Sequence, residues 1–324
     1  MHNPIHAIVV LTRGNNPCLQ TLAQKDVGHG QVRVRVKACA LNFSDLLMIG
    51  GKYQDMPSYP MIPGMEIAGD IVEIGSGITN FSIGDSIVAF CGHGGLSDNI
   101  VISADRCLLR PATLDAIHGA TFPIAYGTSH LALSHRAGLQ VGERLVVLGA
   151  GGGVGLTAVE IGAALGAHVT AVARGPEKLA AAKAAGASVL IDSSQTPDLR
   201  DAILSKGRTD VIYDAVGGAL GDAAMRTLAP EGRYLLIGFA SGKQPQLKPN
   251  HLLVKNISVI GLNLSGYMSF RPDLFTASLE KLFIWHAAGR IRPQISQVLP
   301  LERTLEGLDM LRDRNVTGKV VITP

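Results

Sequence analysis

The chain has 324 residues, of which 47% are hydrophobic, 5% aromatic and 17% charged. This length and composition predict about two globular domains and exclude a disordered or fibrous protein. The 29 Lys and Arg residues and the 26 Asp and Glu residues leave a net charge of +3 with no long basic run, so we expect no nucleic-acid partner.

The N-terminal segment and the cysteines bear on the cellular compartment. Residues 1–10 lack the basic and apolar regions of a secretory signal, and no apolar run reaches the roughly 18 residues of a membrane helix. The four cysteines, Cys18, Cys39, Cys91 and Cys107, form no Cys-x-x-Cys pair, which fits neither a disulfide framework nor a structural zinc site. We therefore expect a cytoplasmic protein with no membrane association.

The first third of the chain is predicted to be rich in β-strands. Residues 31–38 alternate apolar with basic side chains, which is the pattern of a strand with one buried face. Residues 67–74 and 87–90 are short apolar segments close to glycines, and we expect two more strands joined by turns there.

From residue 141 the pattern changes to alternating strands and helices. A strand at 144–148, a helix that follows a glycine cluster and ends near 165, a strand at 169–172 and a helix at 176–185 together predict a parallel sheet built from βαβ units. Further strands are expected at 189–191, 211–213, 234–237 and 257–260, followed by helix 272–288, strand 294–299, helix 301–313 and strand 319–323.

The glycine cluster at 149–155 reads Gly-Ala-Gly-Gly-Gly-Val-Gly and lies between a predicted strand and a predicted helix. In this context a glycine-rich turn brings backbone N–H groups to a pyrophosphate, so the pattern predicts a dinucleotide site. The alternative is a tight turn whose glycines only allow the strand and the helix to pack. The candidate cofactor-binding residues of the turn are Ala150, Gly152, Gly153, Val154 and Gly155.

The end of the second predicted strand indicates which dinucleotide is bound. A carboxylate about 20 residues after the glycines would bind a ribose 2′-hydroxyl, but Ala173 stands at that place, followed by Arg174 and, one helical turn on, Lys178. Two cations without a carboxylate suit a 2′-phosphate, and one Arg contact would favour NADP over NAD by roughly ten- to hundred-fold. The alternative is that Arg174 and Lys178 are solvated surface cations.

Several motifs follow one another along nearly the whole chain. They are Asn42-Phe43-Ser44-Asp45, Gly51-Lys52-Tyr53, Pro63-Gly64-Met65-Glu66 with Ala68-Gly69, Val141-Gly142-Glu143, the turn at 149–155 and Thr317-Gly318-Lys319-Val320-Val321. In these motifs the chain resembles the zinc-free, zeta-crystallin-like quinone oxidoreductase branch of the medium-chain dehydrogenase/reductase superfamily. The resemblance implies an α/β fold, with a GroES-like β-rich catalytic domain (1–124 and 265–324) and a Rossmann domain with a doubly wound parallel sheet (125–264).

The resemblance also bears on metal binding. Zinc alcohol dehydrogenases of this superfamily carry a Cys and a His where this chain has Asn42 and Met65. An amide and a thioether are poor replacements for a thiolate and an imidazole, and the four-cysteine structural zinc lobe is missing as well. We therefore expect no metal site.

The same resemblance implies which residues form the active site. Tyr53 and Asn42 are the expected catalytic residues: Asn42 and Thr128 would lie beside the nicotinamide and its ribose, and Tyr53 would hydrogen-bond a developing enolate or hydroquinone oxygen. The alternative for Tyr53 is a packed aromatic. Many relatives contact the 2′-phosphate with a Tyr where this chain has Asp192, which would weaken NADP binding. Further cofactor contacts are implied for Val216, Gly217, Gly238, Phe239, Leu262 and Asn263.

These features lead to three hypotheses about function. Without a metal to polarise the substrate, the acceptor must already be electrophilic, so the leading hypothesis is an NADPH-dependent reductase of quinones or similar electrophiles. The second is an NADPH-dependent reductase of conjugated enones or 2-enoyl thioesters, and the third is an NADPH-binding protein with little turnover. The apolar residues 257–264 would form an edge strand, and together with the resemblance this predicts a homodimer.

Overall fold

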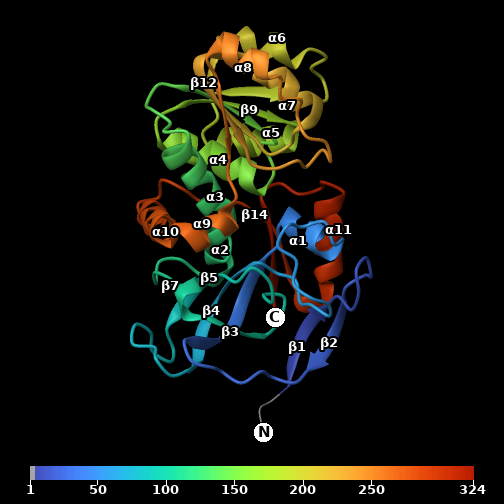
Figure 1. The fold of residues 1–324 in the computed structure, drawn as a ribbon, viewed down its shortest axis with the longest axis vertical. Coiled ribbons are helices and arrows are strands. Elements are labelled where there is room, and N and C mark those ends of the chain that lie inside the picture. Colours follow the sequence, from blue (N-terminus) through green and yellow to red (C-terminus); the bar gives the residue numbers. More distant parts are fainter. Residues whose placement is uncertain (1–3) are drawn as a thin grey trace. The chain divides into compact units, whose positions relative to one another are not determined.

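A computed structural model of the protein describes residues 4–324 and divides into two compact units (Figure 1). Among the described residues, the first unit contains 4–124 and 293–324, and the second contains 125–292. The first unit therefore combines the two ends of the chain, and the second unit is one continuous insertion.

The first unit is built on a seven-stranded, mainly antiparallel sheet in the order β14-β15-β3-β4-β5-β7, with β6 also paired to β3, and carries a separate β1-β2 hairpin. Only β14 and β15 run parallel to each other. Its elements are β1 (Ile5–Val9), β2 (Cys18–Leu22), β3 (Gln31–Ala40), α1 (Phe43–Ile49), β4 (Glu66–Ile74), β5 (Ser86–Phe90), β6 (Asn99–Ser103), the 3₁₀ turn η1 (Ala104–Arg106), β7 (Cys107–Leu109), α2 (Ala116–Gly119), β14 (Ile295–Pro300), the 3₁₀ turn η4 (Leu301–Arg303), α11 (Thr304–Arg312) and β15 (Lys319–Thr323).

Strand β3 lies at the centre of this sheet, and its sequence pattern explains its position. Val32, Val34 and Val36 are buried in the core, as the alternation predicts. Arg35 and Lys37 are exposed on the opposite face, as expected, but Arg33 on that face is buried. Its Nε donates a hydrogen bond to Glu73 Oε2 at 2.8 Å, so the buried charge is paired.

The second unit is a doubly wound sheet of six parallel strands in the order β10-β9-β8-β11-β12-β13. Its elements are the π-helical turn η2 (Phe122–Tyr126), which begins in the first unit, α3 (Gly127–His130), the π-helical turn η3 (Leu131–Arg136), β8 (Arg144–Leu148), α4 (Gly153–Ala164), β9 (His168–Ala173), α5 (Pro176–Ala184), β10 (Val189–Asp192), α6 (Leu199–Leu204), β11 (Thr209–Asp214), α7 (Gly218–Met225), β12 (Leu228–Leu236), α8 (Pro249–Lys255), β13 (Ser258–Gly261), α9 (Leu264–Phe270) and α10 (Pro272–Ala287).

The order of the strands in this sheet places its ligand crevice. The chain builds β8, β9 and β10 outward in one direction, and then returns to place β11 on the other side of β8. This reversal of direction leaves a crevice outside the carboxyl ends of β8 and β11, where open α/β sheets bind their ligands. The predicted fold class, a Rossmann sheet with a separate β-rich unit, is confirmed.

The second unit is longer than the Rossmann domain expected from the sequence. The expected boundary was at residue 264, but residues 265–292 group with the second unit. The cause is packing: α10 lies against α3, η3 and α9, which are all in the second unit. Helical periodicity in 272–288 predicts the helix itself but not the unit on which it packs.

The chain crosses between the units at 124–125 and at 292–293. On the first unit's side of the first crossing, the backbone N–H of residue 124 donates to Glu66 Oε2 at 2.7 Å. On the same unit's side of the second crossing, the carbonyl of Gln294 accepts from the backbone N–H of Lys319 at 2.9 Å. Both crossings are thus anchored to strands of the first unit's sheet, the first to β4 and the second to β15.

The second unit holds its own side of both crossings with helix α4. Thr157 Oγ1 donates to the carbonyl of Ala125 at 3.1 Å. One carboxylate oxygen of Glu160 accepts from the Tyr126 hydroxyl at 2.6 Å, and the other accepts from the backbone N–H of Arg292. The burial of Glu160 raises its pKa to about 7.

Candidate functional site

The parallel register of the second unit gathers the predicted cofactor residues at one edge of its sheet. Leu148 pairs with Val172 and with Asp214, and Leu236 pairs with both Asp214 and Gly261. Each of these paired residues is the last residue of its strand or the one before it. The loops that follow the strands therefore start side by side. The predicted residues in those segments are Ala150, Ala173, Val216, Gly217, Gly238, Phe239, Leu262 and Asn263.

The glycine turn forms the start of α4 as the sequence predicts. Gly152 is the residue before the first helical turn, and no side chain caps the backbone there. The first N–H groups of a helix have no partner within the helix, and they carry the positive end of its dipole. A side chain at residue 155 would collide with the carbonyl oxygen of Gly149. These features fit a bound pyrophosphate, with the N–H groups of Gly153, Val154 and Gly155 available to it.

The tip of β9 carries the two predicted cations. Ala173 is buried, whereas the side chain of Arg174 is exposed, and in residues 4–324 it forms no ion pair. The aliphatic part of the Lys178 side chain packs against Gly151. It fills the space that the Cβ of any other residue at position 151 would need. Lys178 is therefore packed on the glycine turn. This arrangement matches the predicted 2′-phosphate site better than a pair of unconstrained surface cations.

Asp192 was expected to weaken NADP binding, and the structure gives its carboxylate a local role. Asp192 Oδ1 accepts hydrogen bonds from the backbone N–H and the hydroxyl of Ser194, at 2.9 and 2.7 Å, and from the backbone N–H of Gly175 at 3.3 Å. The bonds from Ser194 are the main cause of a lowered pKa at Asp192. The carboxylate thus holds the loop that follows Arg174.

Asp214 is a functional candidate that the sequence analysis missed. It is fully buried at the end of β11, and its Oδ1 accepts from the backbone N–H groups of Val216 and Gly217 at 2.7 and 2.8 Å. Its other oxygen accepts from the hydroxyl of Tyr234. Asp214 therefore shapes the turn of two predicted cofactor residues. A carboxylate directly after the predicted strand residues 211–213 was the available signal.

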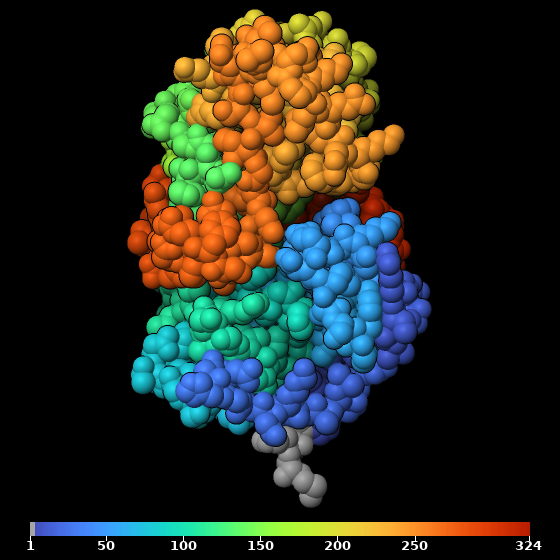
Figure 2. Space-filling model, viewed as in Figure 1, coloured from blue at the N-terminus to red at the C-terminus, as the bar shows by residue number. Residues whose placement is uncertain are grey.

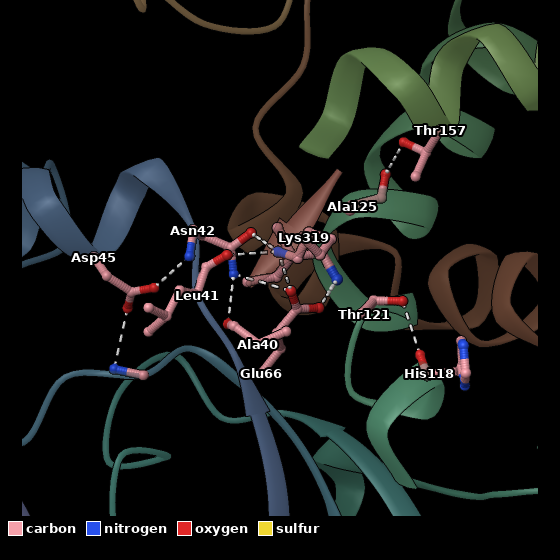
Figure 3. Close-up of polar contacts among 12 residues, drawn as sticks. Ala40, Leu41, Asn42, Asp45, Glu66, His118, Thr121, Ala125, Thr157 and Lys319 are labelled. Carbon is pink, nitrogen blue, oxygen red and sulfur yellow. Dashed lines mark hydrogen bonds and ion pairs between the residues drawn. The ribbon is translucent and has the colours of Figure 1, made fainter. Parts of the chain in front are cut away.

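The predicted residue Asn42 belongs to a buried polar cluster in the first unit (Figure 3). Lys319, at the start of β15, donates from Nζ to Asn42 Oδ1 at 2.7 Å, to the carbonyl of Leu41 at 2.7 Å and to Glu66 Oε1 at 2.9 Å. Lys319 is 4% exposed, Glu66 0% and Asn42 8%. The sequence analysis quoted Lys319 and Glu66 as motif residues only, because 253 positions separate the two.

Asp45 holds the start of α1 beside this cluster. Its two oxygens accept from the backbone N–H groups of Asn42 and Gly64, at 2.8 and 3.0 Å. Burial raises the pKa of Asp45 to about 6, although both hydrogen bonds favour the charged form. The Asp45 carboxylate thus connects the loop that contains Gly64 to the residue that begins α1.

The other two predicted residues lie in different units. Tyr53 is half-buried in the loop that follows α1, in the same unit as Asn42. Thr128 is buried on α3 in the second unit, together with the glycine turn. Their roles beside a nicotinamide or a substrate stay predictions.

Comparison with known proteins identifies the family. A model described as alcohol dehydrogenase GroES-like domain matches residues 28–112, and one described as zinc-binding dehydrogenase matches residues 153–279. A quinone oxidoreductase-like protein 2 homolog from Nematostella vectensis is 36% identical over 92% of this chain and 83% of that protein. The chain belongs to the quinone oxidoreductase-like family of medium-chain dehydrogenases/reductases. The resemblance seen in the sequence motifs is therefore confirmed.

Solved quinone oxidoreductases of this family have the same fold. The Thermus thermophilus enzyme, determined alone and in complex with NADPH, is 30% identical, with a TM-score of 0.86 over 98% of this chain and 100% of that one. The Escherichia coli enzyme, determined in complex with NADPH, is 26% identical, with a TM-score of 0.91 over 98% of this chain and 100% of that one.

One matching family model is described as zinc-binding dehydrogenase, and it covers residues 153–279. The two positions that the sequence analysis compared with zinc ligands, Asn42 and Met65, lie in the GroES-like match at 28–112 and do not fit zinc. Asn42 Oδ1 already accepts a hydrogen bond from the ammonium of Lys319, and Met65 offers only a buried thioether. Within residues 4–324 there is no group of three or more His, Cys, Asp or Glu side chains that could hold a metal. We therefore assign no chemical step to zinc.

None of the helices in residues 4–324 is both long enough and apolar enough to cross a membrane.

The raised pKa of Asp45 predicts a pH effect on stability. Between its ordinary value of 3.8 and about 6, the folded state holds a proton that the unfolded state has released. The free energy of unfolding should therefore fall, by about 3 kcal/mol, as the pH rises through this window. The Asp45→Asn variant should not show this fall in the free energy of unfolding, because its amide does not titrate. We expect urea unfolding from pH 4 to 6.5 to show the wild type losing stability relative to the variant, and a constant difference would contradict the assignment.

Proposed function

We propose that the protein is an NADPH-dependent, zinc-free oxidoreductase that reduces a quinone or a similar electrophile. The observation that carries the proposal is the uncapped glycine turn at the start of α4, beside a strand that ends at Ala173 instead of an acidic residue and is followed by Arg174. The NADPH complexes of the Thermus and Escherichia coli enzymes support the choice of cofactor.

When bound, NADPH supplies the hydride, and the protein binds and orients the reactants. The N–H groups at the start of α4 would hold the pyrophosphate, and Arg174 and Lys178 would hold the 2′-phosphate. Asn42 and Thr128 would hold the nicotinamide end. Tyr53 would donate a hydrogen bond to the acceptor oxygen, on which negative charge develops during reduction.

The second candidate reaction is reduction of a conjugated enone or a 2-enoyl thioester. It needs a proton donor more than quinone reduction does, because water can protonate a hydroquinone product. Tyr53, half-buried in the loop after α1, is the observation that favours this reaction. The third hypothesis, an NADPH-binding protein with little turnover, requires tight cofactor binding without oxidation of NADPH by any electrophile.

The choice among these reactions predicts the behaviour of a Tyr53→Phe variant. We expect the purified protein to oxidise NADPH faster with a small quinone than with an enoyl thioester. The Phe variant should then keep the quinone rate within about ten-fold, because hydrogen-bond loss at a solvated oxygen costs little. Steady-state absorbance of NADPH gives both rates. Selective turnover of the enoyl thioester that is lost in the variant would favour the second reaction, and no turnover would favour the third.

The cofactor assignment predicts a selective effect at Arg174. Arg174→Ala should raise the dissociation constant of NADPH roughly ten-fold or more, because a charge-assisted bond to the 2′-phosphate is lost. NADH, which has no such phosphate, should bind almost as before. Arg200→Ala, which removes an exposed arginine on α6, is the matched control. Fluorescence titration measures all three proteins, and equal losses for both cofactors would place the 2′-phosphate elsewhere.

We also infer that the protein forms a homodimer through the edge of the second unit's sheet. Strand β13 is the last strand of that sheet, and in the described part of the chain it pairs only with β12. The preceding helix α8 lies on the surface (orange in Figure 2), where Leu253 and Val254 are each 78% exposed. An apolar helix face beside an unpaired strand edge favours association with a second copy. A cytoplasmic location stays a prediction.

The dimer predicts a change in mass when the β13 edge is charged. Ser258→Lys places a charge at an exposed position of β13 and should shift the protein from twice the chain mass toward the monomer. Leu190→Lys makes the same change on β10, the opposite edge of the same sheet, and should leave the mass unchanged. Size-exclusion chromatography with light scattering measures both. An active wild-type monomer at low concentration would contradict the proposal.

A further inference from the structure

Hydrogen bonds join the tips of strands β8, β9 and β10 within the second unit. The glycine turn that follows β8 donates two backbone hydrogen bonds to the carbonyl of Val172 on β9, at 3.0 and 3.1 Å. On the other side of β9, its last residue Ala173 pairs with Asp192, the last residue of β10. Arg174 therefore leaves the sheet with the glycine turn on one side and the tip of β10 on the other.

Helix α5, which follows Arg174, is packed on the glycine turn as well. The aliphatic part of Lys178 fills the space beside Gly151. In a βαβ unit with a glycine turn, the end of the second strand is the place that meets the 2′ position of the adenosine ribose. The structure thus fixes the place of Arg174 beside the glycine turn through contacts within one unit.

The backbone is held on both sides of Arg174. The carbonyl of Ala173, before it, accepts from the backbone N–H and the hydroxyl of Ser193 at 2.9 and 3.3 Å. The backbone N–H of Gly175, after it, donates to Asp192 Oδ1 at 3.3 Å. Gly175 has a φ of 83°, which side chains rarely adopt, so the chain turns sharply here. We call these three hydrogen bonds the β10 clamp.

Asp192 uses its carboxylate on the backbone and not on the neighbouring guanidinium. Its Oδ1 also accepts from the backbone N–H and the hydroxyl of Ser194, at 2.9 and 2.7 Å. Arg174 is exposed, and within residues 4–324 it forms no ion pair with Asp192 or with any other carboxylate. Its guanidinium donors therefore remain available to an anionic ligand.

We propose that Asp192 is a positioning residue, which holds the backbone beside Arg174 so that the guanidinium is presented to the 2′-phosphate of NADPH. This inference rests on the NADPH-dependent function proposed above. A held backbone leaves less freedom to be lost when the arginine binds its ligand. The proposal reverses the effect that the sequence analysis expected of Asp192, which was a weakening of NADP binding.

Two other roles of Asp192 lead to different expectations. If its negative charge repels the 2′-phosphate, every variant without the charge binds NADPH more tightly. If Asp192 only stabilises the folded unit, its loss affects NADPH and NADH alike, because NADH differs from NADPH in the 2′-phosphate.

Two substitutions separate the charge of Asp192 from its hydrogen bonds. Asp192→Asn removes the charge and keeps an acceptor oxygen, whereas Asp192→Ala removes both. Asp198→Ala is the matched control, because Asp198 caps α6 by accepting from the backbone N–H of Asp201 at 3.0 Å. Each change is made in the wild type and in Arg174→Ala. Fluorescence titration measures the dissociation constants of NADPH and NADH, and thermal unfolding checks that each variant is folded.

We expect Asp192→Ala to raise the dissociation constant of NADPH about three- to ten-fold, because a hydrogen bond of the β10 clamp is lost. The constant for NADH should stay within about two-fold. Asp192→Asn should bind NADPH at least as tightly as the wild type. In Arg174→Ala, the further change Asp192→Ala should have no effect on NADPH binding, because Asp192 acts through Arg174. Asp198→Ala should change neither constant.

Three results would overturn the inference. They are an Asp192→Ala variant that binds NADPH as tightly as the wild type or more tightly, an equal loss for both cofactors, and a loss that persists in full when Arg174 is absent. Failure of the proposed function gives different results. An Arg174→Ala variant with unchanged NADPH binding would show that the 2′-phosphate site is misplaced, and wild-type protein that binds neither cofactor would contradict the function itself.

Discussion

The buried ammonium of Lys319 imposes a strict condition on the first unit. A charge without partners in a protein interior costs several kcal/mol, and removing one partner of a buried pair typically costs about 3–5 kcal/mol. Three acceptors from β4 and the β3–α1 connection surround this ammonium. The C-terminal strand can therefore bury this ammonium only where these N-terminal acceptors surround it, and this couples the two ends of the chain in one unit.

The second unit depends on a different constraint, the register of parallel strands. The last residue of each strand pairs with the last residue of its neighbour or with the residue before it. The loops that follow consequently begin at one edge, whatever their own sequences. Asp214 and Asp192 then shape two of these loops by accepting backbone N–H bonds. The strands thus fix where the loops begin, and the carboxylates of Asp214 and Asp192 fix the conformation of two of these loops.

Local patterns predicted the features that arise from neighbouring residues. The strand, glycine turn and helix at 144–165 and the strand and helix that follow lie within one or two residues of their expected ends, because apolar periodicity and glycine positions act over short distances. The β1–β2 hairpin was missed, since β2 is mostly exposed and has no apolar alternation. Helix α1 was also missed, because its seven residues are too few to show a helical period.

The features that the sequence could not reveal depend on distant residues. The assignment of 265–292 to the second unit results from packing of α10 on α3. The cluster of Lys319, Glu66 and Asn42 joins three strands or strand ends, and no spacing along the chain encodes it. A lysine at the head of an apolar strand and a glutamate in a glycine-rich motif were visible in the sequence, but their pairing was not.

The anchoring of both chain crossings has a mechanical consequence. In the first unit, the chain at the two crossings is hydrogen-bonded to Glu66 and to the backbone of Lys319. In the second unit, it is hydrogen-bonded to Thr157 and Glu160 of α4. Each unit therefore fixes the chain on its own side of both crossings, with β4 and β15 in the first unit and with α4 in the second. Neither unit depends on the other to set the backbone conformation where the chain enters or leaves it.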